Sequence, residues 1–258
     1  MHADSFYEIG SSHRVCQDYA AHRQTDTEIA ACLADGCSSS KDTDVGARLN
    51  VLSALSQLTE IHKPKGWPND IEYLFFPALT AYKSLCLSGY ERDTTFLGIS
   101  KNRAIIIGDG VLVEKPKDLD FLLITTSEFD NSYPFYTSYF GKEQARHIKP
   151  KLSTYELDIT TGKIFNRFSG PHSSNYTTLP LDKNKLEYAV VFSDGIFSFL
   201  DENNEQIPIS RILLEFFKVK GYQGEFINRR MNVLRRICKK NNWHHYDDLS
   251  AAGIYFGE

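Results

Sequence analysis

Five acidic points along the sequence carry side chains that could bind metal ions. Asp-Gly dipeptides begin at Asp35, Asp109 and Asp194, and each follows an apolar run typical of a β-strand. Gln17-Asp18 near the start and Asp247-Asp248 before the last apolar run add further carboxylates. Oxygen ligands suit hard divalent ions such as Mg²⁺ or Mn²⁺, and two such ions about 3.5–4 Å apart can activate a water for phosphoester hydrolysis. If the fold brings these acidic residues together, the sequence predicts metal-dependent hydrolysis of a phosphoester.

A simple turn is the alternative interpretation of each Asp-Gly dipeptide. Asp-Gly is among the commonest turn sequences, and a two-residue hairpin needs nothing more. Asp109-Gly110 lies between apolar runs at residues 105–107 and 111–113, so it could be the turn of a hairpin. The two interpretations differ in where the fold places the strands on either side.

The elements that must position these residues occur in blocks. Two helices are predicted after Asp35, over residues 43–62 and 70–87, separated by a loop at residues 63–68 and with a kink at Pro77 in the second. Strand-like runs follow at residues 95–100, 104–107, 121–125, 152–157 and 186–193. Two more helices are expected at residues 207–218 and 222–240, and a last strand at residues 251–256. Helices segregated from mainly antiparallel strands favour a layered α+β fold.

Five motifs with these acidic points occur in a set order. They are Gly10-Ser11-Ser12-His13 with Cys16-Gln17-Asp18-Tyr19-Ala20, Ala34-Asp35-Gly36, Thr94-Thr95-Phe96-Leu97-Gly98 with Ile107-Gly108-Asp109-Gly110, Phe192-Ser193-Asp194-Gly195-Ile196, and Asp247-Asp248-Leu249-Ser250. Together they resemble the metal-dependent protein phosphatases of the PPM (protein phosphatase 2C) family, in particular its bacterial cytosolic serine/threonine branch. The resemblance covers nearly the whole chain. It implies one PPM-type domain over residues 1–258, folded as a four-layer αββα sandwich with two central, mainly antiparallel sheets.

The resemblance also implies a role for each motif residue. Asp35 matches the family's carboxylate that bridges two metals, and Gly36 offers its backbone carbonyl oxygen. The implied metal ligands are Asp18, Asp35, Gly36, Asp109, Asp194 and Asp247, with Asp109 serving a third, weaker site. The implied cofactors are two Mn²⁺ or Mg²⁺ ions. Asp35, Asp194 and Arg14 are the expected catalytic residues, Arg14 as a phosphate-binding guanidinium.

Two positions depart from the best-known family members. Gln17 stands where they carry Glu, and a neutral amide binds a hard cation less strongly than a carboxylate does. Cys37 stands where animal members carry a His proposed as general acid. Proton delivery to the leaving group would then fall to a metal-bound water or to His13, which could instead hold the loop by hydrogen bonds. The segment 128–131, with aromatic residues after it, resembles an element of the same branch and could form a wall of the site.

The implied activity is hydrolysis of phosphoserine and phosphothreonine on proteins by a metal-bridging water. The alternative is a binding or regulatory module that keeps the fold but has weak or no turnover. Gln17, Cys37 and the variable setting of Arg14 support this alternative. Retention of four acidic motif positions argues against it, because a module without catalysis has no chemical need for them.

Composition excludes several other classes of protein. The net charge is −4, from 29 basic and 33 acidic residues, so nothing draws the chain as a whole to nucleic acid or to an anionic membrane. The first residues lack the apolar segment of a signal peptide, and no apolar run is long enough to span a membrane. Five cysteines without Cys-x-x-Cys spacing are typical of reduced thiols. We therefore expect a cytoplasmic protein whose partners are a phosphoprotein substrate and a cognate kinase.

Overall fold

The computed structural model describes residues 1–60, 71–129, 133–218 and 221–257. Two antiparallel sheets form its centre, one of seven strands in the order β1-β14-β11-β6-β7-β8-β9 and one of five in the order β10-β5-β4-β3-β2. The seven-stranded sheet consists of β1 (His2–Glu8), β6 (Gly110–Pro116), β7 (Phe121–Glu128), β8 (Lys151–Asp158), β9 (Ile164–Pro171), β11 (Leu186–Phe192) and β14 (Leu249–Tyr255). The five-stranded sheet consists of β2 (Tyr19–Gln24), β3 (Ile29–Ala34), β4 (Phe96–Ser100), β5 (Arg103–Ile107) and β10 (Tyr176–Pro180).

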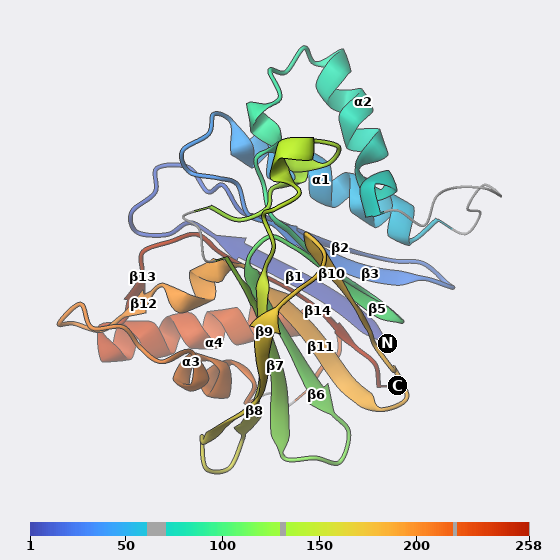
Figure 1. Cartoon of the computed structure of the whole chain (residues 1–258). Helices are drawn as coiled ribbons and strands as arrows, with labels where there is room; N and C mark the ends of the chain where they lie inside the picture. Colours follow the sequence, from blue (N-terminus) through green and yellow to red (C-terminus); the bar gives the residue numbers. More distant parts are fainter. Residues whose placement is uncertain (61–70, 130–132, 219–220, 258) are drawn as a thin grey trace.

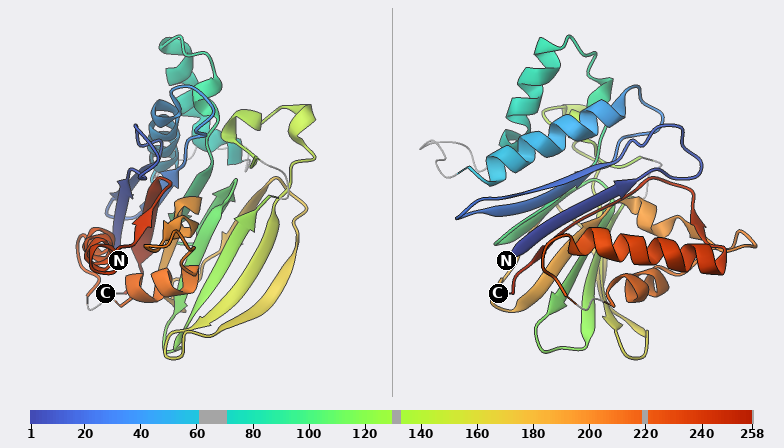
Figure 2. Two further views of the ribbon diagram at one scale, coloured as in Figure 1. Left: turned by 90° about the vertical axis from the view of Figure 1, so that its left-hand side faces the viewer. Right: turned by 180° about the vertical axis from the view of Figure 1, so that it is seen from behind.

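Helices cover the outer face of each sheet. α1 (Thr43–Leu58) lies on the five-stranded sheet with α2 (Phe76–Ser84) packed against it, and α3 (Ile209–Phe216) and α4 (Phe226–Asn241) lie on the seven-stranded sheet. Figure 1 shows the two pairs of helices on opposite sides of the strands, and the right-hand view of Figure 2 shows α1 and α4 in the same relation. The αββα sandwich predicted from the sequence is confirmed.

Three layers of apolar side chains hold these four layers of backbone together. One cluster joins α1 to the five-stranded sheet, a second joins α3 and α4 to the seven-stranded sheet, and a third fills the space between the sheets. The sequence of β3 is apolar throughout because both of its faces are buried. Ala30 and Cys32 face the α1 side, whereas Ala31 and Leu33 face the other sheet, so every residue of the strand is buried. The ends of such doubly buried strands are rigid supports for a site.

The first predicted helix begins at the expected residue but is shorter than predicted. α1 begins at Thr43 and ends at Leu58, and the predicted end at residue 62 and the loop at residues 63–68 lie outside the described residues. The second predicted helix is divided into a 3₁₀ helix, η1 (Ile71–Phe75), and α2. Pro77 lies in the first turn of α2 instead of kinking a longer helix, because a missing backbone N–H has no cost there.

The hairpin interpretation of Asp109-Gly110 is wrong. β5 ends at Ile107 in the five-stranded sheet, and β6 begins at Gly110 in the seven-stranded sheet, so the dipeptide links two sheets. Gly108 and Gly110 both have positive φ, of 93° and 140°, which glycine adopts without strain. The apolar runs on either side therefore bury their side chains in different sheets and do not pair with each other.

Several strands were not expected from the sequence. β1, β2, β9 and β10 have mixed polar and apolar residues and lie at or near the edges of the sheets. β1 pairs with β14 from His2 opposite Tyr255, which brings the two ends of the chain together, as Figure 1 shows. Among the described residues, no helix is long and apolar enough to cross a membrane.

Candidate active site

A cleft of about 260 Å³ lies where strands of both sheets end. It is lined by His13, Asp35, Gly36, Cys37, Ser38, Thr95, Asp109, Pro134, Tyr136, Asp194 and Asp247. Four of the carboxyl groups predicted as metal ligands meet here from distant parts of the sequence. His13 is the only basic side chain among these lining residues. The cleft therefore concentrates negative charge.

Each carboxyl group comes from the end of a buried strand. Asp35 follows β3, and Asp109 follows β5. Asp194 follows β11 and begins a short 3₁₀ helix, η5 (Asp194–Phe197). Asp247 precedes β14 on the neighbouring strand of the same sheet. Strand ends hold these side chains more firmly than loops would.

Gly36 lies in the cleft because the loop after Asp35 packs tightly against α1. A Cβ atom at Gly36 would lie 2.7 Å from Oγ1 of Thr43, closer than real contacts allow. The Gly36 backbone also bridges to Thr94, and its N–H donates to the Gln17 carbonyl at 3.2 Å. Only glycine therefore allows this part of the backbone to approach both the helix and the cleft.

Asp18 lies below the lining of the cleft, beside Asp35. It is buried, and its Oδ2 accepts a hydrogen bond from the Ser193 hydroxyl at 2.7 Å. Its Oδ1 has no hydrogen-bond partner among the described residues. A buried carboxylate oxygen without a donor is costly unless a cation or a proton lies next to it.

The crowded carboxyl groups resist ionisation. Burial raises the pKa of Asp18 to about 7, and burial together with the charge of Asp194 raises the pKa of Asp109 to about 8. Burial and the neighbouring carboxylates of Asp18 and Asp194 hold the pKa of Asp35 well above its usual range. The pKa of Asp194 is raised by burial and by the charge of Asp247. Bound cations would reverse these shifts by stabilising the charged forms.

The donor set fits hard divalent cations. In the described chain, no Lys or Arg forms an ion pair with Asp18, Asp35, Asp109 or Asp194. The carboxyl groups instead act on one another by charge, and those of Asp18 and Asp194 both oppose the ionisation of Asp35. As they stand, no three described His, Cys, Asp or Glu side chains form a group that could hold a metal ion. A bound ion would therefore require carboxyl groups of the cleft to turn toward it.

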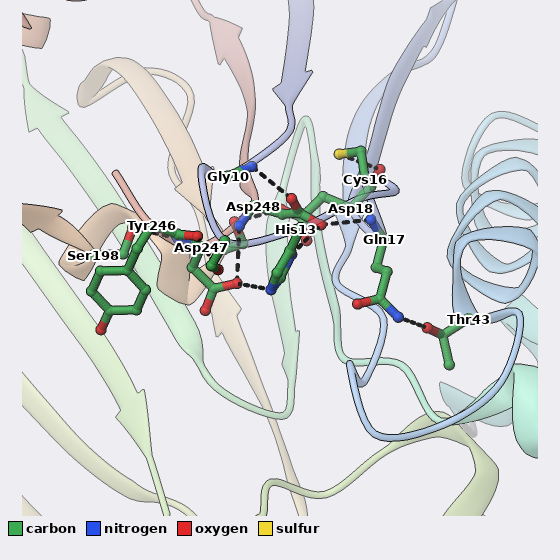
Figure 3. A network of polar contacts seen from close by, with 12 residues as sticks. Gly10, His13, Cys16, Gln17, Asp18, Thr43, Ser198, Tyr246, Asp247 and Asp248 are labelled. Carbon is green, nitrogen blue, oxygen red and sulfur yellow. Dashed lines mark hydrogen bonds and ion pairs between the residues drawn. The ribbon is translucent and has the colours of Figure 1, made fainter. Parts of the chain in front are cut away.

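Asp248 anchors the N-terminal loop beside the cleft. It is buried, and it accepts hydrogen bonds from the backbone N–H groups of Gly10 at 2.8 Å and Gln17 at 2.6 Å. Nδ1 of His13 lies 3.0 Å from the Asp248 carboxylate, and Nε2 lies 3.5 Å from Asp247 (Figure 3). Burial lowers the pKa of His13, but these carboxylates outweigh burial and raise it. His13 therefore lies at ion-pair distance from Asp247 and Asp248, but its Nδ1 makes no hydrogen bond within the described residues, so its role in holding the loop by hydrogen bonds stays a prediction.

The side chain of Gln17 is directed toward α1. Its Nε2 donates to Oγ1 of Thr43 at 2.7 Å and to the Cys37 carbonyl at 3.4 Å, and Figure 3 shows the contact with Thr43. Gln17 is not among the residues that line the cleft. In this arrangement the amide joins the loop after Asp35 to the first helix, a structural role that the motif alone did not reveal.

The structure does not bring Arg14 into the cleft. Its side chain is exposed, and it is absent from the lining, unlike its neighbour His13. Contact between Arg14 and a phosphate stays a prediction, which the activity of Arg14→Ala can test.

The aromatic segment after β7 contributes two residues to the cleft, Pro134 and Tyr136. Tyr136 belongs to the aromatic run that the sequence indicated as a possible wall, whereas Pro134 was not singled out. Part of the predicted wall at residues 128–131 lies outside the described residues, at residues 130 and 131. Its described part, Glu128 and Phe129, borders an adjoining cavity of about 340 Å³ that shares Asp109 and Asp194 with the cleft. The density of aromatic residues was the only signal in the sequence.

A family model described as "Protein phosphatase 2C" matches residues 9–232, which include four of the five motifs. The chain belongs to the protein phosphatase 2C family. It is therefore a protein serine/threonine phosphatase. A comparison with the curated proteins found no match.

Solved structures of bacterial phosphatases share the fold. A bacterial serine phosphatase is 15% identical over 100% of this chain and 98% of its own, with a TM-score of 0.53. The serine/threonine phosphatase Stp1 from Staphylococcus aureus is 15% identical over 99% of this chain and 95% of its own, with a TM-score of 0.53. The S. agalactiae serine/threonine phosphatase is 14% identical over 98% of both chains, with a TM-score of 0.51. At these identities the likeness supports the fold of the phosphatase and nothing finer.

Proposed function

We propose that the phosphatase removes phosphate from phosphoserine and phosphothreonine on proteins, with two Mn²⁺ or Mg²⁺ ions in the cleft. The observation that carries the proposal is the meeting of Asp35, Asp109, Asp194 and Asp247 in one cleft without a Lys or Arg among the lining residues. Such a site is electrostatically incomplete, and divalent cations are the partners that oxygen ligands select.

Individual residues would hold the ions as follows. Asp35 would contact both, because the charges of Asp18 and of Asp194 both act on its carboxyl group. Asp194 and Asp247 would complete one site, Asp18 and the Gly36 carbonyl the other, and Asp109 a third, weaker one. When bound, the cations supply an activated water, orientation of the phosphate and neutralisation of its charge. Asp248 and His13 would fix the position of Asp247 through the contacts described above.

A weak or inactive phosphatase is the second candidate. It is favoured by one observation, the engagement of the Gln17 amide with Thr43 and Cys37, which leaves the second metal site with fewer ligands from this motif. The choice between the two candidates depends on turnover.

The decisive experiment measures hydrolysis of p-nitrophenyl phosphate and of a phosphoserine peptide with Mn²⁺, with Mg²⁺ and with EDTA. Turnover that requires the metal and disappears in EDTA supports the active enzyme. Metal binding in calorimetry without turnover on either substrate would favour the regulatory module. Absence of metal binding would contradict both the assigned ligands and the mechanism.

The biological setting follows from the proposed chemistry. A phosphoprotein is the substrate, and a protein kinase must supply it, because phosphoserine and phosphothreonine are kinase products. We propose that both act in the cytoplasm with this phosphatase.

A further inference from the structure

The wall of the cleft formed by the segment after β7 carries a phenol. Tyr136 lines the cleft together with Cys37 and the acidic strand ends. Asp35 and Asp109 are close enough for their charges to act on the phenol. Thiol sulfur is a weak hydrogen-bond acceptor. The thiol of Cys37 would therefore not compete for the Tyr136 hydroxyl with an oxygen of a bound substrate.

The backbone next to Tyr136 is held firmly. The N–H of Thr137 donates to the Thr94 carbonyl at 2.9 Å, and the Thr137 hydroxyl donates to the Arg92 carbonyl at 2.8 Å. The buried Asn50 amide donates to the hydroxyls of both Thr94 and Thr137, at 2.8 and 3.0 Å. Thr94 directly precedes Thr95 in the cleft lining. These bonds tie Tyr136 to the rigid end of β4, as a preorganised donor requires.

The geometry of phosphoryl transfer determines what such a donor would meet. Attacking and leaving oxygens lie roughly in line on opposite sides of phosphorus. The carboxyl groups gather on the side of the strand ends, where the attacking water belongs in the proposed function. A leaving oxygen on the far side of phosphorus from them would meet other lining residues, of which Tyr136 carries a phenol.

The only basic side chain that lines the cleft already lies beside carboxylates. Nδ1 of His13 is 3.0 Å from Asp248, and Nε2 is 3.5 Å from Asp247. Cys37 stands where animal members of the family carry a His proposed as general acid, and its Sγ lies 3.1 Å from the Ser39 hydroxyl. Burial, followed by the nearby Cys37 and carboxyl groups, raises the pKa of Tyr136, so the phenol keeps its proton.

We propose that the Tyr136 hydroxyl donates a hydrogen bond to the leaving-group oxygen of the phosphomonoester and stabilises its developing negative charge. The inference rests on the proposed phosphatase function. No proton transfer from Tyr136 is required, because the hydrogen bond alone strengthens as charge develops on the oxygen. The assignment makes Tyr136 a catalytic residue for alcohol leaving groups such as serine and threonine.

Tyr136→Phe tests the proposal, because it removes only the hydroxyl. We compare kcat/KM of the Mn²⁺-loaded proteins on a phosphoserine peptide and on p-nitrophenyl phosphate. Nitrophenolate is a stable leaving group that needs little help, whereas a serine alkoxide is a poor one. We expect a loss of about 30- to 300-fold on the peptide and less than about 3-fold on p-nitrophenyl phosphate. A series of aryl phosphates should show a steeper dependence of rate on leaving-group basicity in the variant.

Tyr139→Phe is the matched control. Tyr139 belongs to the same segment, and its ring packs against Tyr136 with centroids 5.5 Å apart, but it lines a different cavity. This variant should keep both activities within about 2-fold.

The possible results separate this inference from the function it rests on. Equal losses on both substrates, or an unchanged dependence on leaving-group basicity, would overturn the assignment and show a role in binding phosphate or in packing. No loss on either substrate would overturn it as well. A wild-type protein without turnover would overturn the proposed function itself, and the inference with it.

Discussion

At the scale of single residues, Asp35 is the central group of the cleft. Burial and the charges of Asp18 and Asp194 all oppose the ionisation of its carboxyl group. It stands at the end of β3, a strand buried on both faces and therefore a rigid support for its backbone. Any cation that relieves the repulsion among these groups must interact with Asp35.

We therefore expect Asp35→Asn to lower turnover on p-nitrophenyl phosphate by about 100-fold or more, because it weakens both proposed metal sites. Gln17→Ala should lower turnover by less than about 10-fold, because the Gln17 amide contacts Thr43 and not the cleft. Rates measured over a range of Mn²⁺ concentrations provide the comparison. Equal losses in the two variants would argue against Asp35 as the shared ligand.

The stability of the same variant distinguishes lost chemistry from lost structure. In EDTA, Asp35→Asn should unfold at the same or a higher urea concentration than the wild type, because the substitution removes one of several repelling carboxylates. A destabilised variant would mean that the drop in activity reflects unfolding.

Asp109 belongs to the proposed third metal site. We expect Asp109→Ala to leave the two tighter sites occupied and to saturate with Mn²⁺ at a lower rate, with calorimetry losing only a weak binding step. Asp109→Asn should behave in the same way, because the charge is what the ion needs. Asn tolerates turn geometry as well as Asp does, so full activity in Asp109→Asn would remove the third metal from the proposal.

At the scale of elements, Asp93 joins two parts of the site that are distant in sequence. Its Oδ2 accepts a hydrogen bond from the Ser40 hydroxyl, in the loop after Asp35, and its Oδ1 accepts one from Ser138, in the segment that carries Tyr136. One carboxylate thus fixes both sides of the cleft relative to each other.

Asp93→Ala should lower the free energy of unfolding by about 2–4 kcal/mol, because it removes two hydrogen bonds to a charged acceptor. Amides of residues 137–140 should exchange hydrogen faster, while those of β11 should keep their protection relative to global unfolding. Urea unfolding and hydrogen exchange give the two readouts, and the exposed Asp26→Ala is the control. Unchanged exchange at residues 137–140 would contradict the role of Asp93 as a clamp.

At the scale of the whole molecule, the carboxyl groups link metal binding, pH and stability. In the absence of cations, native Asp18 and Asp109 keep their protons to about pH 7 and about pH 8, whereas the unfolded chain loses them near the ordinary value of 3.8. Between pH 3.8 and these raised pKa values, the native state binds more protons than the unfolded state. The free energy of unfolding of the metal-free protein must therefore fall as pH rises.

We expect the melting temperature in EDTA to fall from pH 5 to pH 8, and the increase caused by saturating Mn²⁺ to grow over the same range. Cations bind the deprotonated carboxylates, so they replace the lost protons and restore stability. Thermal unfolding at each pH, with and without Mn²⁺, gives the measurement. In Asp35→Asn, Mn²⁺ should raise the melting temperature less than it does in the wild type. An increase in melting temperature from Mn²⁺ that did not depend on pH would contradict the proposed ligands.

The sequence by itself was sufficient for the fold class and for the order of the acidic motifs. Long apolar runs such as β3 and β11 are recognisable because both faces are buried, and Asp35 follows β3 directly while Asp194 follows β11 after one serine. The edge strands β2 and β9 were missed because each has a solvent-exposed face or edge and so carries mixed residues. Their place is determined by pairing with neighbours, which a local pattern does not contain.

Only the tertiary structure decided which residues meet. Asp109-Gly110 had the sequence of a hairpin turn, yet it links two sheets, because β5 pairs with β4 and β10 whereas β6 pairs with β7 and β11. The direction of the Gln17 amide toward Thr43 and the exposure of Arg14 were equally invisible in the sequence. Spacing along the chain specifies which side chains exist at strand ends, whereas packing of the two sheets and of the loops between them sets the distances on which chemistry depends.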